Sequence, residues 1–217
     1  GWWTNEGQKI SKSLRNVIDP TTLTAQYGLD QTRYFLMREV PFGNDGDFSV
    51  TAMTYRMNSD LANDLGNLCQ RVVSMIFKNC DGLTPALPAE LSDEDQMLLS
   101  AADSLLDKVG DLLDRQAFSG ALRLIWQVVA DANRYVDLSA PWALKKTDPA
   151  RMREVLGVLA ETIRQIAILI QPFMPQSANK ILDQLGVDAA ERDFSSIAGK
   201  GRLVSGRQIG KPSPVFP

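Results

Sequence analysis

Apolar residues recur at helical spacing over most of this chain, from Ser49 to Gly186, and proline or glycine interrupts the pattern at short intervals. Side chains three or four residues apart lie on one face of an α-helix, so each uninterrupted stretch presents one apolar stripe. Such helices must bury their stripes against one another, and short connections make consecutive helices antiparallel. The chain is therefore predicted to be mainly α, an antiparallel helical bundle. Its first stripe comprises Leu61, Leu65, Leu68, Val72 and Ile76.

Capping residues and prolines divide this pattern into individual helices. Ser49 is expected to cap a long helix that reaches about Asn79, and Ser92 or Asp93 to cap a helix that extends through Leu112. The tail from Ala198, which is rich in glycine and proline, is predicted to pack as loop. The other predicted helices cover 118–135, 149–171 and 176–185 in the bundle, and 19–28 and 30–40 before a short strand or hairpin at 42–48.

Composition and charge argue against several classes of protein. The 217 residues carry a formal net charge of −3, so no overall positive field favours nucleic acid, and any RNA contact needs a local patch. The chain has no histidine, which removes imidazole zinc sites and Ser-His-Asp triads. Cys69 and Cys80 lack the spacing of a zinc site, and we interpret them as reduced thiols of a cytoplasmic protein. Without a long apolar run or a signal-peptide pattern, neither a membrane nor a secreted protein is expected.

A short basic motif, Lys9-Ile10-Ser11-Lys12-Ser13, lies near the start of the chain. Two ammonium groups and two hydroxyls on a mobile loop suit a polyphosphate. When a carboxylate attacks the α-phosphate of ATP, negative charge builds on the departing pyrophosphate, and cations that meet this charge lower the barrier. An isolated string of this kind is more often a solvated basic loop, so the motif alone leaves both interpretations open.

The sequence around the motif resembles a known family. Residues 1–20 are similar to the KMSKS region of class I aminoacyl-tRNA synthetases, with Ile10 in place of the usual methionine. The segment 34–49 resembles the stem-contact region of methionyl-tRNA synthetases, and 211–217 resembles the end of their anticodon-binding bundle. This resemblance implies two parts. Residues 1–48 would be the end of a catalytic domain with a small α/β stem-contact segment, and residues 49–217 would be an α-helical anticodon-binding domain.

The resemblance also implies roles for the motif residues. Lys9 and Lys12 would be catalytic, and Lys12 with Ser11 and Ser13 would bind ATP. The family usually has glycine where this chain has Arg15. If this position requires a positive φ, arginine strains the loop by about 1 kcal/mol or more. Alternatively, the arginine adds a third cation near the phosphates, and the sequence does not decide between the two.

A second group of candidate site residues lies in the bundle. Asn67 and Arg71 share a helix face opposite the apolar stripe, and their side chains can hydrogen-bond the base edges of single-stranded RNA. Trp142 follows Pro141 at a predicted helix break, where an indole can stack on a base. A polar helix face is usually just solvated, and a lone tryptophan usually packs in a core, as we expect for Trp126. The resemblance favours RNA binding, because the matching Asn, Arg and Trp of the methionyl family bind the CAU anticodon.

Three further segments have simpler interpretations. Lys145 and Lys146 could hold phosphates, although basic residues at such a place are also routine surface. The acidic stretch 90–95 is interpreted as the complement of a helix N-terminus, and no metal site is predicted. Trp2 and Trp3 are expected to face a catalytic-domain surface that this chain lacks.

Membership in this family would make the parent enzyme a cytoplasmic methionine–tRNA ligase. Its partners would be methionine, ATP with Mg²⁺, and tRNA(Met) including the initiator tRNA, with no DNA or membrane partner. Alone, the chain lacks the upstream nucleotide-binding fold, so we expect it to bind no cofactor and to form no adenylate. The alternatives are a module that only binds tRNA, a fragment of another class I synthetase such as the cysteinyl enzyme, and a purely structural bundle.

Overall fold

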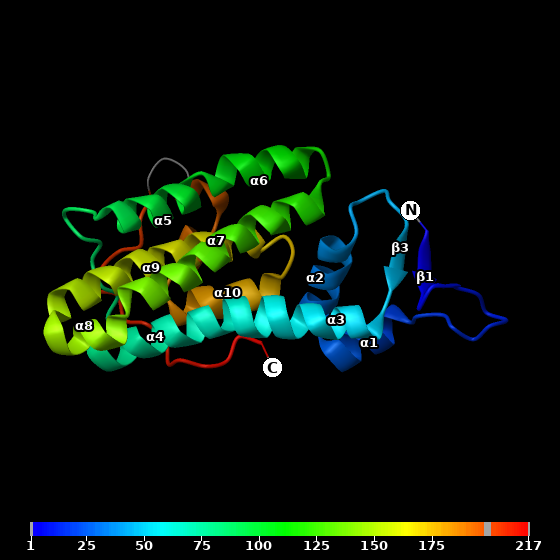
Figure 1. The fold of residues 1–217 in the computed structure, drawn as a ribbon, viewed down its shortest axis with the longest axis horizontal. Coiled ribbons are helices and arrows are strands. Elements are labelled where there is room, and N and C mark those ends of the chain that lie inside the picture. The colour runs from blue at the N-terminus through cyan, green and yellow to red at the C-terminus, as the bar shows by residue number, and fades with distance from the viewer. Residues whose placement is uncertain (1, 198–200, 217) are drawn as a thin grey trace.

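A small N-terminal α/β unit and a larger helical bundle follow one another along the long axis of the molecule (Figure 1). The structure, a computed structural model, describes residues 2–197 and 201–216. The sheet lies at one end, and α8 (Pro141–Thr147) lies at the other (Figure 1). The predicted fold class, mainly α with a small α/β segment, is confirmed. Within the described residues, no helix has the length and apolar character needed to cross a membrane.

Three short strands form the sheet of the N-terminal unit, in the order β2-β1-β3. β1 (Trp3–Asn5) and β2 (Gln8–Lys9) are antiparallel, and they are joined by two residues with positive φ, Glu6 and Gly7, as a tight hairpin turn requires. β3 (Gly46–Phe48) pairs parallel to β1. The predicted strand at 42–48 is therefore present, and it is not one arm of a hairpin, because its partner strand precedes it by some forty residues.

Two helices lie between β2 and β3. α1 (Pro20–Tyr27) begins where expected, because the Asp19 carboxylate accepts a hydrogen bond from the amide of Thr21 at 2.9 Å. It ends at Gly28, whose φ is 94°, and α2 (Leu29–Glu39) follows. A small core of Phe35, Phe48 and Met53 joins α2 to β3 and to the helix that follows it, α3 (Val50–Arg56).

Trp2 and Trp3 differ in their surroundings. Trp3 packs against the small core of the N-terminal unit, whereas Trp2 is 84% exposed. The expectation that both face a catalytic-domain surface stays a prediction, and Trp3 is in addition partly covered within this chain. The parallel pairing of β1 with β3 places this indole next to Gly46, where an added Cβ would lie 3.2 Å from the ring.

One continuous helical rod connects the N-terminal unit to the bundle. It consists of α3 (Val50–Arg56), η1 (Met57–Gly66) and α4 (Asn67–Asn79), and Ser49 caps it through the amide of Ala52. Its predicted extent is confirmed, but η1 is a π-helix rather than an α-helix. Side chains from α7 (Phe118–Ser139) hydrogen-bond carbonyls of this wider helix: Trp126 donates to that of Asp60 and Asn133 to that of Asp64, both at 3.1 Å. Trp126 is buried, as predicted.

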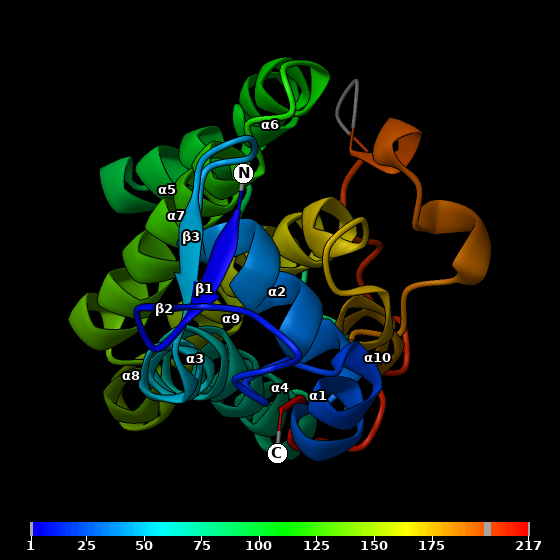
Figure 2. The ribbon, with the colours of Figure 1, turned by 90° about the vertical axis from the view of Figure 1, so that its right-hand side faces the viewer.

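The rest of the bundle follows the predicted order with one break. The helix expected from Ser92 to Leu112 is divided at Ser104, whose hydroxyl donates to the carbonyl of Ala101 at 2.9 Å. Figure 2 views the bundle along its long axis, and there α9 (Pro149–Ile170) lies inside the group of helices. The tail from residue 201 is loop, as predicted, and residues 198–200 lie outside the described part. The elements are α5 (Asp93–Asp103), α6 (Leu105–Asp114), α7, α8, α9 (Pro149–Ile170), α10 (Pro175–Gln184), η2 (Ala189–Glu191) and η3 (Phe194–Ser196).

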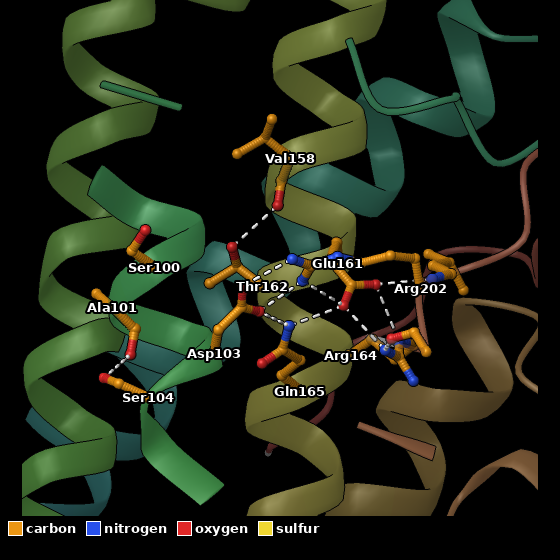
Figure 3. Close-up of polar contacts among 12 residues, drawn as sticks. Ser100, Ala101, Asp103, Ser104, Val158, Glu161, Thr162, Arg164, Gln165 and Arg202 are labelled. Atoms are coloured by element: carbon orange, nitrogen blue, oxygen red, sulfur yellow. Dashed lines mark hydrogen bonds and ion pairs between the residues drawn. The ribbon is translucent and has the colours of Figure 1, made fainter. Parts of the chain in front are cut away.

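α9 is the central helix, buried continuously from Val155 to Ile170. Its polar residues pair with one another and with the tail (Figure 3). Glu161 accepts hydrogen bonds from Arg164 at 2.9 and 3.0 Å and from the amide of Leu203 at 2.8 Å. Arg202 of the tail reaches Asp103 of α5 at 2.6 Å. Each buried charge therefore has a partner, as burial requires, and the network holds the tail against the bundle.

The N-terminal unit and the bundle are joined by α2 as well as by the helical rod. Tyr34 of α2 belongs to the main core, where its ring centroid lies 4.7 Å from that of Trp126. Asp30 accepts a hydrogen bond from the amide of Ser177 at 2.6 Å, at the start of α10. Arg33 donates to the carbonyl of Phe173 at 2.9 Å. These contacts fix the position of the N-terminal unit relative to the bundle.

Candidate functional sites

The two-lysine motif forms an exposed loop between β2 and α1. Lys9 ends β2, and Lys12 lies at the turn of the loop, with both side chains exposed. The hydroxyls of Ser11 and Ser13 lie 3.0 Å apart, and the amide of Leu14 donates to Ser11 Oγ at 3.2 Å. The motif serines therefore shape the loop from within, while Lys9 and Lys12 are exposed and available to an anion.

Arg15 closes the turn of this loop in the left-handed region, with a φ of 52°. Its amide donates to the carbonyl of Lys12 at 3.2 Å. Arg15 therefore has the positive φ that the first of the two alternatives assumes, a conformation that glycine adopts without cost. The arginine side chain is also exposed, so its charge remains accessible to an anion in solution.

Asn67 and Arg71 lie one helical turn apart on α4, as their spacing predicts. Leu61, Leu65 and Leu68 of the apolar stripe are fully buried, whereas Asn67 is exposed and Arg71 is partly exposed. Arg71 donates to Asn133 at 2.8 Å and to Asp137 at 3.0 Å, both on α7. These two contacts hold the guanidinium plane in one orientation.

Trp142 lies at the start of α8, directly after a sharp change in chain direction. Ala140 adopts the left-handed conformation with a φ of 42°, and Pro141 begins the helix. The indole is 50% exposed. Together with Arg71 it lines an apolar pocket of about 330 Å³, so the fold brings these two candidate residues to one place. The other walls come from Gln70, Val72, Ser74, Met75, Val136, Pro141, Leu156 and Leu159.

Asn67 lies beside an adjoining hollow of about 240 Å³ rather than in the pocket of Trp142. Gln70 lines both cavities and therefore marks their border. The far wall of the hollow is the C-terminal tail, through Val215 and Phe216, and the Phe216 ring packs where Gly66 leaves room for it. Sequence reasoning missed this contribution of the tail, because loop residues carry no periodic signal of what they contact.

The structure also gives the surroundings of the remaining candidate groups. Within residues 2–197 and 201–216, no three acidic, cysteine or histidine side chains gather as a metal site would. Asp95 caps α5 and also pairs with Arg151 at 2.7 Å, so it does more than complement a helix terminus. Cys69 and Cys80 are free and buried, and burial raises the pKa of the Cys69 thiol to about 12. Lys145 and Lys146 are exposed at the end of α8.

Family models match both parts of the chain. Residues 1–73 match the model of class I tRNA synthetases (M), and residues 87–217 match the model of the anticodon-binding domain of methionyl-tRNA ligase. Among curated proteins, the methionine–tRNA ligases of Rhizobium meliloti and Brucella suis are each 52% identical over the full 217 residues. The chain spans 42% of the length of each of these relatives.

Solved structures give the same picture. Mycobacterium tuberculosis methionyl-tRNA synthetase in complex with methionyl-adenylate matches with a TM-score of 0.95 at 47% identity, over all of this chain and 43% of that one. The apo form of the same enzyme matches with a TM-score of 0.92 at 45% identity, over all of this chain and 42% of that one.

The two-lysine loop, the small sheet and the helical bundle define a segment of a class I aminoacyl-tRNA synthetase joined to its anticodon-binding domain. More specifically, the chain belongs to the methionyl-tRNA ligase family.

Proposed function

We propose that this chain supplies the anticodon-binding bundle and the two-lysine loop of a methionine–tRNA ligase. The observation that carries the proposal is the shared pocket of Arg71 and Trp142, with Asn67 in the hollow beside it. An indole, a guanidinium and an amide on one surface are the groups that bind unstacked RNA bases. The family supports methionine, rather than another amino acid, as the substrate of the longer protein.

At the bundle, a base of the CAU anticodon stacks on the exposed half of the Trp142 indole. The pocket walls exclude water from one side of that base, which strengthens its hydrogen bonds with the Arg71 guanidinium. Asn67 offers both a donor and an acceptor to a neighbouring base in the adjoining hollow. The preferred partner is tRNA(Met), including the initiator tRNA, because both carry this anticodon.

At the other end of the chain, the loop acts on ATP. The carboxylate of methionine attacks the α-phosphate, the bond from that phosphorus to the β-phosphate oxygen breaks, and pyrophosphate leaves. Lys9 and Lys12 neutralise the charge that grows on the leaving group, and the hydroxyls of Ser11 and Ser13 support the loop around it. Magnesium would accompany ATP; no three acidic, cysteine or histidine side chains gather in the described residues, and we assign magnesium no ligand in this chain.

We place the boundary between the two parts at residues 48 and 49, where β3 ends and Ser49 caps the helical rod. The match to the class I model continues to residue 73, along the rod and into α4. The rod and the contacts of α2 with α10 connect the loop to the anticodon pocket through packed structure. This arrangement suits an enzyme that acts on ATP at one end of the chain and holds the anticodon at the other, and we propose that it works in the cytoplasm.

The bundle assignment is tested by titrating this chain with an anticodon stem-loop that carries CAU. Trp142→Ala is expected to weaken binding about 10- to 100-fold, which corresponds to the loss of one base–aromatic stack. Trp2→Ala is the matched control, since it removes an exposed indole at the other end of the molecule and should leave the affinity unchanged. Equal affinity of wild type and Trp142→Ala, or no preference over a stem-loop with a changed first anticodon base, would remove the assignment.

A second measurement separates the binding and catalytic roles. The chain alone is expected to give no methionine-dependent pyrophosphate exchange, because the lysine loop acts on ATP that is held by other parts of the longer enzyme. In the longer enzyme, Lys12→Ala should slow this exchange while leaving the affinity for the anticodon stem-loop intact. Pyrophosphate exchange by the isolated chain would contradict this separation of the binding role from the catalytic role.

A further inference from the structure

Asn16 holds the two-lysine loop closed through its side chain. Its Oδ1 accepts a hydrogen bond from the amide of Ser11 at 2.8 Å, and its Nδ2 donates to the carbonyl of Lys9 at 3.0 Å. These two backbone groups lie on either side of Ile10. The side-chain amide of Asn16 therefore pairs with the backbone around Ile10 as the backbone of a neighbouring strand would. Only a group with a donor and an acceptor at this spacing can make both bonds.

The same residue is tied to the sheet by its backbone. The carbonyl of Asn16 accepts a hydrogen bond from Asn5 Nδ2 at 2.9 Å, and Asn5 is the last residue of β1. The loop is therefore fixed at its start by the strand pairing of Lys9 with Thr4 and at its end by this contact. The side chains of Lys9 and Lys12 are exposed on this anchored loop.

The strained turn at Arg15 is explained by this bridge. A left-handed residue reverses the chain, and here it returns Asn16 toward Lys9, its partner across the loop. A non-glycine residue adopts this conformation only where surrounding contacts compensate for its cost. The contacts that hold the turn are those of Asn16, the bond from the Arg15 amide to Lys12, and the bond from the Leu14 amide to Ser11.

We propose that Asn16 is a positioning residue for the adenylation step. It sets the path of the backbone from Lys9 to Lys12, and so sets where their ammonium groups can meet the leaving pyrophosphate. It touches no reacting atom itself. Without it, the loop must be ordered during each turnover, and a loss of alignment of about 1 Å can cost on the order of 100-fold in rate. The inference rests on the proposed role of the two lysines.

The geometric part is tested on this chain alone by amide hydrogen exchange. Asn16→Ala should make the Ser11 amide exchange at least about tenfold faster, because that amide loses its acceptor. Asn16→Asp keeps an acceptor for Ser11 but loses the donor to Lys9, so protection of Ser11 should be largely retained. Asn44→Ala, in another exposed loop, is the control and should change nothing at Ser11. A Ser11 amide that exchanges equally fast in wild type and Asn16→Ala would overturn the bridge.

The functional part is tested in the full-length ligase that contains this chain, by methionine-dependent pyrophosphate exchange. Asn16→Ala and Asn16→Asp are both expected to lower kcat about 10- to 100-fold, because both lose the bond to Lys9, while KM for methionine and affinity for the anticodon stem-loop stay unchanged. If Lys9→Ala and Lys12→Ala lower kcat but neither Asn16 variant does, the positioning role is overturned and the proposed function stands. If the lysine variants leave kcat unchanged, the proposed function of the loop fails, and the inference fails with it.

Discussion

Arg71 and Trp142 line the same apolar pocket although they belong to different helices, α4 and α8. The position of each depends on α7. Its residues Asn133 and Asp137 bind the guanidinium, and its end at the left-handed Ala140 directs the chain into α8. The proposed anticodon pocket is thus a product of the bundle as a whole, and its geometry should respond to changes in α7 that lie outside the pocket.

A double-mutant cycle tests this dependence. Asn133→Ala removes the acceptor that orients Arg71 and should weaken binding of a CAU stem-loop by about 1 kcal/mol. In an Arg71→Ala background, which should itself cost about 2 kcal/mol, the same change should have almost no further effect on binding. Fluorescence titration of the four proteins measures the coupling, with unfolding curves to correct for stability. Additive effects would mean that Asn133 acts on binding by some other route.

Much of the fold could be predicted because its helix boundaries are local. Asp19-Pro20, Ser49 and Ser92 carry their capping acceptors in the sequence itself, and each begins a helix as expected. The π-helix could not be predicted in this way. Leu61 and Leu65 are four residues apart, a spacing that suits either helix type, and the donors that bind its carbonyls, on Trp126 and Asn133, lie more than sixty residues away.

In the candidate site, too, some features follow from the local sequence and others only from tertiary contacts. That Asn67 and Arg71 share a polar face followed from their spacing alone, since four residues make about one turn. That Arg71 shares a pocket with Trp142 and that Phe216 closes the hollow of Asn67 depend on tertiary packing. Family resemblance grouped Asn67, Arg71 and Trp142 before the structure did, because it carries tertiary information that periodicity lacks, but it did not indicate Phe216.

Two helical glycines should respond in opposite ways to alanine. Gly110 in α6 has nothing within 4 Å of an added Cβ, so Gly110→Ala should raise the free energy of unfolding by about 1 kcal/mol through helix propensity. Gly157 in α9 packs against the connector after α4, and an added Cβ would lie 2.5 Å from the carbonyl oxygen of Ala86. Gly157→Ala should therefore lower the free energy of unfolding by about 1–3 kcal/mol. Urea denaturation of both variants checks this, and a stabilised Gly157→Ala protein would show that the connector does not pack there.

The Asp95–Arg151 pair should make the free energy of unfolding depend on pH. Burial alone would raise the pKa of Asp95, but hydrogen bonds from Arg151, Tyr135 and Ser92 outweigh it and hold this pKa below its usual value. The unfolded chain therefore takes up a proton here at a higher pH than the folded protein does. The stabilisation is present above about pH 4 to 5 and is lost as pH falls through the lower, folded pKa.

The variant Asp95→Asn checks this in unfolding curves measured near neutral pH and again near pH 3. It should cost about 3 kcal/mol at neutral pH, since Arg151 loses its buried charged partner and keeps only the more exposed Glu154, and clearly less in acid. Asp93→Asn, an exposed neighbour in the same first turn of α5, should have only a small effect at either pH. An equal cost for Asp95→Asn at both pH values would argue against the lowered pKa.

Arg15 allows the backbone and the charge of the two-lysine loop to be separated. Arg15→Gly and Arg15→Val both remove the cation, but glycine accepts a φ of 52° and a β-branched side chain does not. If the backbone conformation at position 15 matters more than its charge, the Leu14 amide of Arg15→Gly should be protected from hydrogen exchange at least as well as in wild type. In Arg15→Val this amide should exchange about tenfold faster, because the positive φ then costs the loop about 1–2 kcal/mol. Pyrophosphate exchange by the full-length ligase should then follow the same order. If a third cation near the phosphates dominates instead, both variants should lose activity equally, because glycine restores the turn but not the charge.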